Sequence, residues 1–349
     1  MSEDRSPVME ALLETRKLEI GYRNRGKISR VASGLSLQVR TGELICLAGQ
    51  NGAGKSTLLR TLAGVQKPLS GEVFLDGSEI ISHSQTAIAK RLGLVLTEKA
   101  EAEGFSVRDI VALGRFPHTD WKGILTSEDQ YKVDKALNIV GADALSGRLF
   151  THLSDGEKQK VMIARAIAQE TDIILLDEPT AFLDLLRKVE IISILRDLAS
   201  SGTKGILMAI HDISLALQYA DRIWLFEPET GITEGSPEDL VLSGAIERAF
   251  SSEKFSFDPV SGKYPVYDRN NIRIALKGTG SVVYWTAKGL ARQGFDVCSD
   301  YPSAMATVTV TEKDGSFLWE VSVEDKILSS HTTVLSMIDQ LKGMFIHRS

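Results

Sequence analysis

The sequence predicts an α/β protein with two domains. Its 349 residues exceed the roughly 100 to 200 residues of a single domain, so one large and one small domain are expected. Apolar residues make up 43% of the chain and charged residues 25%, which is the balance of a folded globular protein. Strand-like and helical segments alternate after about residue 157, and this order predicts a largely parallel sheet.

The larger domain is predicted to begin with a β-rich subdomain, with strands at residues 12–22, 33–40 and 43–49. From residue 88 to residue 142 the apolar residues recur at spacings of three and four, which predicts a helical region; with the helix that follows, it forms a helical insert over about 100–165. The remaining elements are expected to be helix 157–169, strand 173–176, helix 185–199, strand 205–210, helix 214–220 and strand 222–226.

A polar segment at residues 251–270, with two prolines, predicts a linker between domains 1–250 and 271–349. The small domain has an α/β pattern, and no motif assigns it a role. Gly278 and Gly280 stand between a strand and a helix there, and we interpret them as a turn. Its predicted elements are strand 272–277, helix 282–294, strand 295–299, strands 306–312 and 316–323 and helix 333–345.

Charge and hydropathy exclude several functional classes. The net charge is -6 and no run of Lys and Arg forms a basic stripe, so nucleic acid is not an expected partner. The N-terminal residues lack the apolar core of a signal peptide, and no apolar stretch reaches the roughly 20 residues that cross a bilayer. We therefore expect a cytosolic protein that reaches a membrane only through a partner.

Residues 49–56 match the pattern G-x-x-x-x-G-K-[ST] of a phosphate-binding loop, the P-loop. The motif follows a predicted strand and precedes a predicted helix, which is the context it requires and which disfavours a chance glycine turn. The loop amides are expected to bind phosphate, Lys55 the β and γ oxygens of ATP, and Ser56 a Mg²⁺ ion. The predicted nucleotide-binding residues of this segment are Gly49, Asn51, Gly52, Ala53, Gly54, Lys55, Ser56 and Thr57.

Two carboxylates follow the apolar strand at residues 173–176. Asp177 is the expected Mg²⁺ ligand, and Glu178 the group that positions or deprotonates the attacking water. By itself such a strand is often only a core strand with a solvated end. Together with a P-loop in the same domain, it indicates hydrolysis of a nucleoside triphosphate.

Residues 153–157, LSDGE, resemble the signature of ATP-binding-cassette (ABC) ATPases, whose usual form is LSGGQ. Ser154 and Gly156 keep the hydroxyl and the close-approach glycine, whereas Asp155 and Glu157 depart from the pattern. On this resemblance the chain is identified as the ATP-binding and ATP-hydrolysing subunit of an ABC transporter, with an ABC-type P-loop NTPase fold. The same residues fit a helix capping box with Ser154 as N-cap, and both roles can coexist.

The resemblance implies further roles for single residues. Tyr22 is expected to stack on adenine, Asp184 to lie in a loop that contacts a partner subunit, and His211 to sense the γ-phosphate and act in catalysis with Lys55 and Glu178. Glu98 stands where the family carries a glutamine that binds Mg²⁺ and links to the membrane partner. Alternatively, Glu98 is a solvated loop residue.

Residues 107–118 resemble the corresponding segment of ATPases that power importers of ferric siderophores, haem and cobalamin, although a plain helix ended by Pro117 also fits. The implied partners are a second copy of the chain, which encloses ATP, and a permease dimer on which the helical insert docks. A substrate-binding protein acts indirectly. The implied location is peripheral, at the cytoplasmic face of the cell membrane.

Two other functions fit parts of the sequence. The departures at Glu98, Asp155 and Glu157 are compatible with a degenerate cassette that senses ATP or assists assembly without hydrolysing it. The intact Lys55 and Glu178 argue against that reading. A soluble ABC ATPase outside transport would be expected to carry a long coiled coil, zinc-binding cysteines or a second cassette. The sequence shows none of these.

Overall fold

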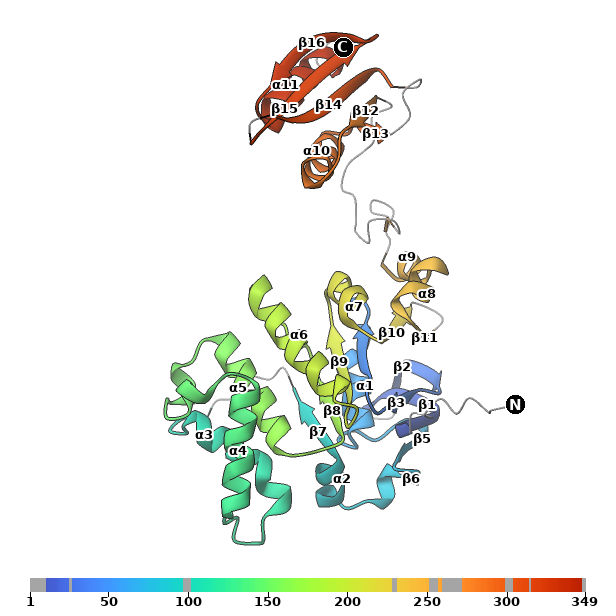
Figure 1. Cartoon of the computed structure of the whole chain (residues 1–349). Coiled ribbons are helices and arrows are strands. Elements are labelled where there is room, and N and C mark those ends of the chain that lie inside the picture. Colours follow the sequence, from blue (N-terminus) through green and yellow to red (C-terminus); the bar gives the residue numbers. More distant parts are fainter. Residues whose placement is uncertain are drawn as a thin grey trace, which may run out of the picture. The chain divides into compact units, whose positions relative to one another are not determined.

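The computed structural model describes residues 11–24, 27–96, 102–227, 231–250, 257–258, 272–298, 304–313 and 315–346. The chain divides into two compact units, residues 1–263 and 264–349, which are coloured from blue to orange-yellow and from orange to red in Figure 1. Each unit has its own buried apolar cluster, so each builds its own core.

The first unit opens with an antiparallel sheet. Its strands are ordered β2-β1-β5-β6, and β3 pairs with β1. The sequence analysis predicted β1 and combined β2 and β3 into one strand, but it did not predict β5 or β6. The bounds are β1 (Ala11–Asn24), β2 (Lys27–Leu35), β3 (Gln38–Arg40), β5 (Ser70–Leu75) and β6 (Ser78–Glu79).

The second sheet of this unit is parallel except at one edge, which confirms the predicted α/β fold. Its order is β11-β10-β4-β9-β8-β7, and only β11 runs antiparallel to its neighbour. All residues of β4, β8 and β9 are buried, as expected for strands covered on both faces. The strands are β4 (Leu44–Ala48), β7 (Leu92–Val95), β8 (Ile173–Leu176), β9 (Gly205–Ile210), β10 (Arg222–Glu227) and β11 (Gly231–Gly235).

Strand β7 corrects the expectation of a helical region from residue 88 onwards. In this region the helix α2 (Gln85–Arg91) ends at Arg91, and the chain continues directly into β7. This strand pairs in parallel with β8 over four residues. A four-residue apolar run has too few positions to show a period of either 2 or 3.6.

The helical insert consists of α3 (Val107–Ala112), α4 (Ser127–Ile139) and α5 (Asp155–Ala168), which lie together at the β7 side of the sheet in Figure 1. Each begins with a capping box in which an N-cap hydroxyl and an acidic side chain three residues later satisfy the first free amides. The other helices are α1 (Lys55–Leu62), α6 (Leu185–Ser200), α7 (Ile213–Tyr219), α8 (Pro237–Leu242), α9 (Ala245–Phe250) and the 3₁₀ turns η1 (Ile80–Ser82), η2 (Leu113–His118), η3 (Asp143–Leu145) and η4 (Phe150–His152).

The second unit is a five-stranded sheet of order β13-β12-β14-β15-β16 with two helices that pack on each other. Trp319 joins the sheet to the first helix, because its indole N–H donates to Thr286 Oγ1 at 2.8 Å in the core. The sequence analysis predicted every element except β16. The bounds are β12 (Arg273–Lys277), α10 (Ser281–Ala291), β13 (Asp296–Cys298), β14 (Ala306–Lys313), β15 (Ser316–Val323), β16 (Lys326–His331) and α11 (Val334–Phe345).

Gly278 supports the interpretation of its loop as a structural turn. Its φ is 136°, and a Cβ there would lie 2.8 Å from Val283 Cγ2 and 3.0 Å from the carbonyl oxygen of Val310. Close packing of the loop against β14 therefore accounts for the glycine without a ligand.

Candidate functional site

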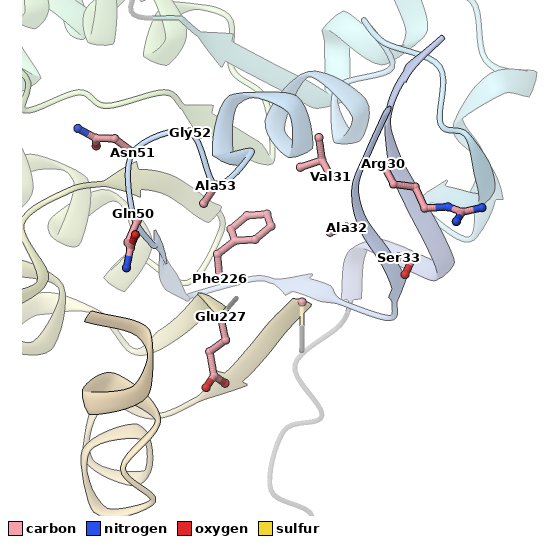
Figure 2. A pocket seen from close by; sticks show the side chains of 11 residues that line it. Arg30, Val31, Ala32, Ser33, Gln50, Asn51, Gly52, Ala53, Phe226 and Glu227 are labelled. Atoms are coloured by element: carbon pink, nitrogen blue, oxygen red, sulfur yellow. The ribbon is translucent and has the colours of Figure 1, made fainter. Parts of the chain in front are cut away.

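The P-loop connects β4 to α1, and two of its glycines are required by close packing. At Gly49 a Cβ would lie 2.8 Å from Phe226 Cβ, and at Gly54, where φ is 108°, it would lie 2.0 Å from Val31 Cγ1. Figure 2 shows the loop residues Gln50 and Asn51 on one side and Val31 on the other side of a cavity of about 470 Å³, which Phe226 also lines. The glycines thus let the loop curve tightly against β2 and β10.

Lys55 is buried at the start of α1. Its ammonium donates to the carbonyl oxygens of Gly49 at 2.9 Å and Gln50 at 3.1 Å, so the side chain folds back over the loop. Burial lowers the pKa of Lys55, while the carboxylates of Glu178 and Asp177 oppose this shift. The ammonium is thus held where phosphate oxygens would meet the loop amides.

Ser56 and Asp177 form a pair of hard oxygen donors. Ser56 Oγ donates to Asp177 Oδ1 at 3.0 Å. Burial raises the pKa of Asp177, and the hydrogen bond from Ser56 opposes this. Within the described residues, no group of three or more His, Cys, Asp or Glu side chains could hold a metal. Two oxygen donors fit Mg²⁺, which keeps several water or phosphate ligands of its own.

Glu178 and His211 meet at the ends of neighbouring strands. His211 Nε2 contacts Glu178 Oε1, and His211 Nδ1 lies 3.4 Å from Lys55 Nζ. Glu178 has a φ of 51°, a left-handed conformation that a residue with a side chain rarely adopts. The arrangement holds a carboxylate in a fixed orientation next to the P-loop ammonium, as a proton acceptor requires.

Lys55, Ser56, Glu178 and His211 line one cavity of about 370 Å³, and Asp177 lies behind it, bonded to Ser56. Tyr22 borders it, with its hydroxyl anchored 2.6 Å from Thr57 Oγ1 and its side chain about half exposed. The anchored hydroxyl fixes the orientation of an exposed aromatic ring that a planar base can stack on. The described lining residues are Tyr22, Val31, Asn51, Gly52, Gly54, Lys55, Ser56, Thr57, Glu178 and His211.

Ser154 and Gly156 do not line this cavity. Ser154 is the N-cap of α5, and its hydroxyl donates to Glu157 Oε2 at 2.7 Å, so the capping box is present. Hydrogen bonds from Ser154 lower the pKa of Glu157, which keeps that carboxylate ionised at neutral pH. In one chain the signature segment is therefore separate from the nucleotide cavity.

Ala181 and Phe182 line a neighbouring cavity of about 380 Å³ together with Glu178 and His211, whereas Asp184 does not line it. Asp184 is the N-cap of α6, since its Oδ1 accepts the Arg187 N–H at 3.0 Å. Phe182, which the sequence analysis did not single out, has a φ of 62° and is 87% exposed. Its only sequence signal is a large apolar residue inside a polar loop. Glu98 lies outside the described residues.

Comparison with known proteins identifies the family. Residues 32–181 match the family model described as ABC transporter. An ABC transporter ATP-binding protein of Methanocaldococcus jannaschii is 36% identical over 82% of this chain and 98% of its own length. The chain belongs to the ABC transporter ATP-binding proteins. It is thus an ABC-type ATPase, as the signature segment predicted.

Other proteins similar to the cassette are two transport ATP-binding proteins and one transporter of solved structure. The achromobactin transport ATP-binding protein of Dickeya dadantii is 36% identical over 68% of this chain and 87% of its own. The ferric enterobactin transport ATP-binding protein of Escherichia coli is 34% identical over 72% and 92%. The structure of a metal-chelate type ABC transporter in an inward-facing conformation has a TM-score of 0.60, with 29% identity over 69% of this chain and 89% of that chain.

The small unit also has a family match. Residues 271–342 match the family model described as iron ABC transporter C-terminal domain. The sequence analysis assigned this unit no role. The match assigns residues 271–342 to a known domain family.

Proposed function

We propose that this cassette hydrolyses ATP to power an importer of ferric siderophores. The match of residues 271–342 to the iron ABC transporter C-terminal domain supports this proposal most directly. The names of the similar achromobactin and ferric enterobactin proteins agree with it, as does the sequence of residues 107–118. Relatives from Halobacterium salinarum named for cobalamin import make haem or cobalamin the substrates to test against.

Each residue of the nucleotide site has a separate role in the proposed hydrolysis of ATP. The P-loop amides and Lys55 bind the β- and γ-phosphates, and Ser56 and Asp177 hold Mg²⁺ with them. Bound Mg²⁺ neutralises part of the charge on the phosphate oxygens. Glu178 accepts the proton of the attacking water, and His211 keeps its carboxylate oriented toward the γ-phosphate. Tyr22 stacks on adenine. Glu98, if aligned with the family glutamine, adds an oxygen ligand.

A second copy of the chain completes the site. The nucleotide cavity is lined by one chain's P-loop but not by its own Ser154 or Gly156. These residues are at the N-terminus of α5, where free amides favour an anion. In the proposed homodimer they meet the γ-phosphate held by the partner, so ATP joins the subunits. The segment with Asp184 and the exposed Phe182 lies beside this interface.

A permease is the proposed partner of the helical insert. The insert carries a groove of about 340 Å³ that is lined by α3, η2 and the segments on either side of them. Exposed Phe105, Leu113 and Phe116 border it, which suits an apolar helix face from the permease. In the described part of the chain no helix is both long and apolar enough to span a bilayer. The cassette would thus be peripheral, held at the cytoplasmic face of the membrane by the permease.

Replacing Glu157 by Gln is expected to tighten ATP-dependent dimerisation. The carboxylate is bonded to Ser154, which is proposed to meet the γ-phosphate, and like charges a few ångströms apart near solvent cost about 1 kcal/mol. The amide keeps an acceptor for the Ser154 N–H. The dimer contains two such contacts, so about 2 kcal/mol is gained, and sedimentation with a non-hydrolysable ATP analogue should show a dimer constant about 30-fold tighter. Glu128→Gln, on exposed α4, is the control; an unchanged or weaker dimer for Glu157→Gln would contradict this role of its charge.

Uptake by proteoliposomes tests the substrate. The cassette is reconstituted with its permease, and ferric siderophore, haem and cobalamin are each offered with the matching binding protein. ATP-dependent accumulation of the ferric siderophore alone would support the proposal. Accumulation only of haem or cobalamin would reject the substrate and keep the importer.

A further inference from the structure

The 3₁₀ turn η2 has two faces with different surroundings. Leu113 and Phe116 border the groove proposed for the permease. Gly114, Arg115 and His118 instead contact the C-terminal end of α5, the helix whose first turn carries Ser154. One short turn therefore touches both the proposed docking groove and the signature helix.

The contact between η2 and α5 is close. A Cβ on Gly114 would lie 2.2 Å from the carbonyl oxygen of Arg165, so the two backbones touch there. Two residues after α5 ends, the chain turns through Glu170, which has a φ of 54°. The last carbonyls of a helix lack partners within it, so something else must bind them.

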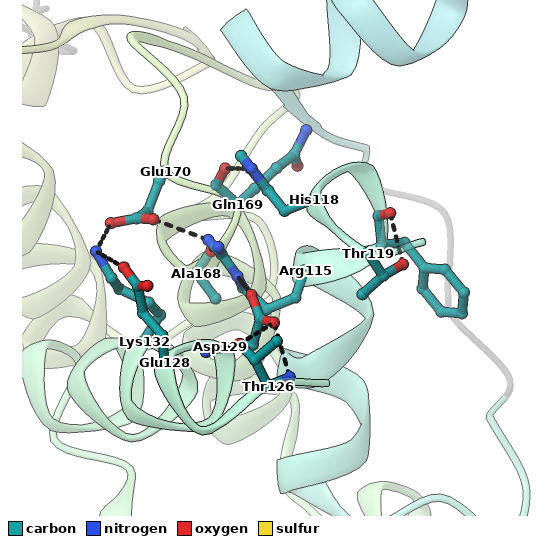
Figure 3. Close-up of polar contacts among 11 residues, drawn as sticks. Arg115, His118, Thr119, Thr126, Glu128, Asp129, Lys132, Ala168, Gln169 and Glu170 are labelled. Carbon is teal, nitrogen blue, oxygen red and sulfur yellow. Dashed lines mark hydrogen bonds and ion pairs between the residues drawn. The ribbon is translucent and has the colours of Figure 1, made fainter. Parts of the chain in front are cut away.

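Arg115 binds one of these carbonyls. Its Nη1 donates to Ala168 O at 2.7 Å and to Glu170 Oε2 at 3.0 Å, and its Nε donates to Asp129 Oδ1 at 2.9 Å. His118 Nε2 lies 2.9 Å from the next carbonyl, Gln169 O. Figure 3 shows Arg115 between Asp129 on one side and Ala168 and Glu170 on the other.

The ion pair of Arg115 and Asp129 at the centre of the network is buried. The Arg115 side chain is 6% exposed and that of Asp129 is 8% exposed. Hydrogen bonds from Thr126 and Arg115 lower the pKa of Asp129 to about 2, so it stays ionised over the physiological range. Lys132 joins from the surface through Glu170. A buried ion pair of this kind fixes geometry more than it adds stability.

We propose that Arg115 is a positioning residue that transmits motion between the signature end of α5 and the permease groove. The helix has 14 residues, which is about 20 Å, and its inner face is buried, so it moves as one body. Arg115 links η2 to the C-terminal end of α5, which is the end opposite Ser154. The inference rests on the proposed function, because it requires a permease in the groove.

Coupling between the ATP site and the permease groove is reciprocal, so it can be measured as a change in either binding affinity. If α5 and η2 move together, ATP changes the affinity for the permease, and the permease changes the affinity for ATP by the same factor. A residue that only supports the fold changes both affinities without changing this factor. Measuring this factor therefore distinguishes a positioning residue from a residue that only stabilises the fold.

The test compares Arg115→Lys with Arg108→Lys. Arg108 pairs with Asp134 on the surface of the same insert and does not bind the end of α5. The affinity of each full-length variant for its permease in nanodiscs is measured with and without a non-hydrolysable ATP analogue. Wild type and Arg108→Lys are expected to show an ATP-dependent shift on the order of 10-fold, and Arg115→Lys a shift of about 2-fold or less, with ATP affinity in isolation unchanged.

Each result decides the inference. A full shift in Arg115→Lys would overturn it, even if the affinities for ATP and permease both fell, because a residue with only a structural role leaves the shift unchanged. Should Arg115→Lys not fold, His118→Ala removes the neighbouring contact at an exposed position and is expected to give an intermediate shift; an unaltered shift there overturns the inference. A wild type that never binds permease rejects the proposed function itself, before any variant is compared.

Discussion

Replacement of Glu178 by Gln is expected to lower steady-state ATP hydrolysis by about 10²- to 10⁴-fold while ATP still binds. The glutamine has nearly the same shape but cannot accept a proton from the attacking water. His211, which contacts this carboxylate, keeps a hydrogen-bond partner in the amide oxygen. Phosphate release by the purified chain measures the rate, and calorimetric titration with ATP measures binding.

Glu247→Gln is the matched control, because Glu247 is exposed on α9 and does not line the nucleotide cavity. It should hydrolyse ATP at the wild-type rate. Near wild-type turnover in Glu178→Gln would mean that another group accepts the proton. Loss of ATP binding together with turnover would mean that Glu178 chiefly shapes the site.

Replacement of Lys55 by Ala is expected to weaken ATP binding by roughly 10²- to 10⁴-fold. Hydrogen bonds to charged groups contribute about 1.5–3 kcal/mol each, and Lys55 is positioned to give its ammonium to both the β- and the γ-phosphate. The Ala variant also leaves the carbonyls of Gly49 and Gln50 without their present donor. Titration with Mg·ATP measures the change in the dissociation constant.

Lys135→Ala provides the comparison, since Lys135 is an exposed residue of α4 with the same loss of charge. Its ATP affinity should match wild type. An affinity in Lys55→Ala within a factor of about two of wild type would contradict the phosphate-binding role.

Much of the fold could be predicted from short stretches of sequence. The eight residues of the P-loop motif predict a strand, a tight turn and a helix around them. Strands β8 and β9 were predicted at residues 173–176 and 205–210, which are the bounds observed. Elements without strong periodicity were missed. Strands β6 and β7 are two and four residues long, so pairing with neighbours determines them rather than their own sequence.

The catalytic side chains were predicted singly, but their contacts were not. Lys55 and His211 are 156 positions apart and meet only because β4 and β9 are adjacent. The hydrogen bond between Ser154 and Glu157 could be predicted, since a capping box is local. The buried position of Arg115 could not, because its partners come from two segments further along the chain, α4 and residues 168–170.

Hydrolysis of Mg·ATP by the purified cassette, with and without its permease in lipid, tests the central claim most directly. The account predicts turnover that the permease stimulates and that Glu178→Gln loses in both conditions. Tight ATP binding with no turnover in either condition would contradict it and would favour an ATP sensor or assembly factor.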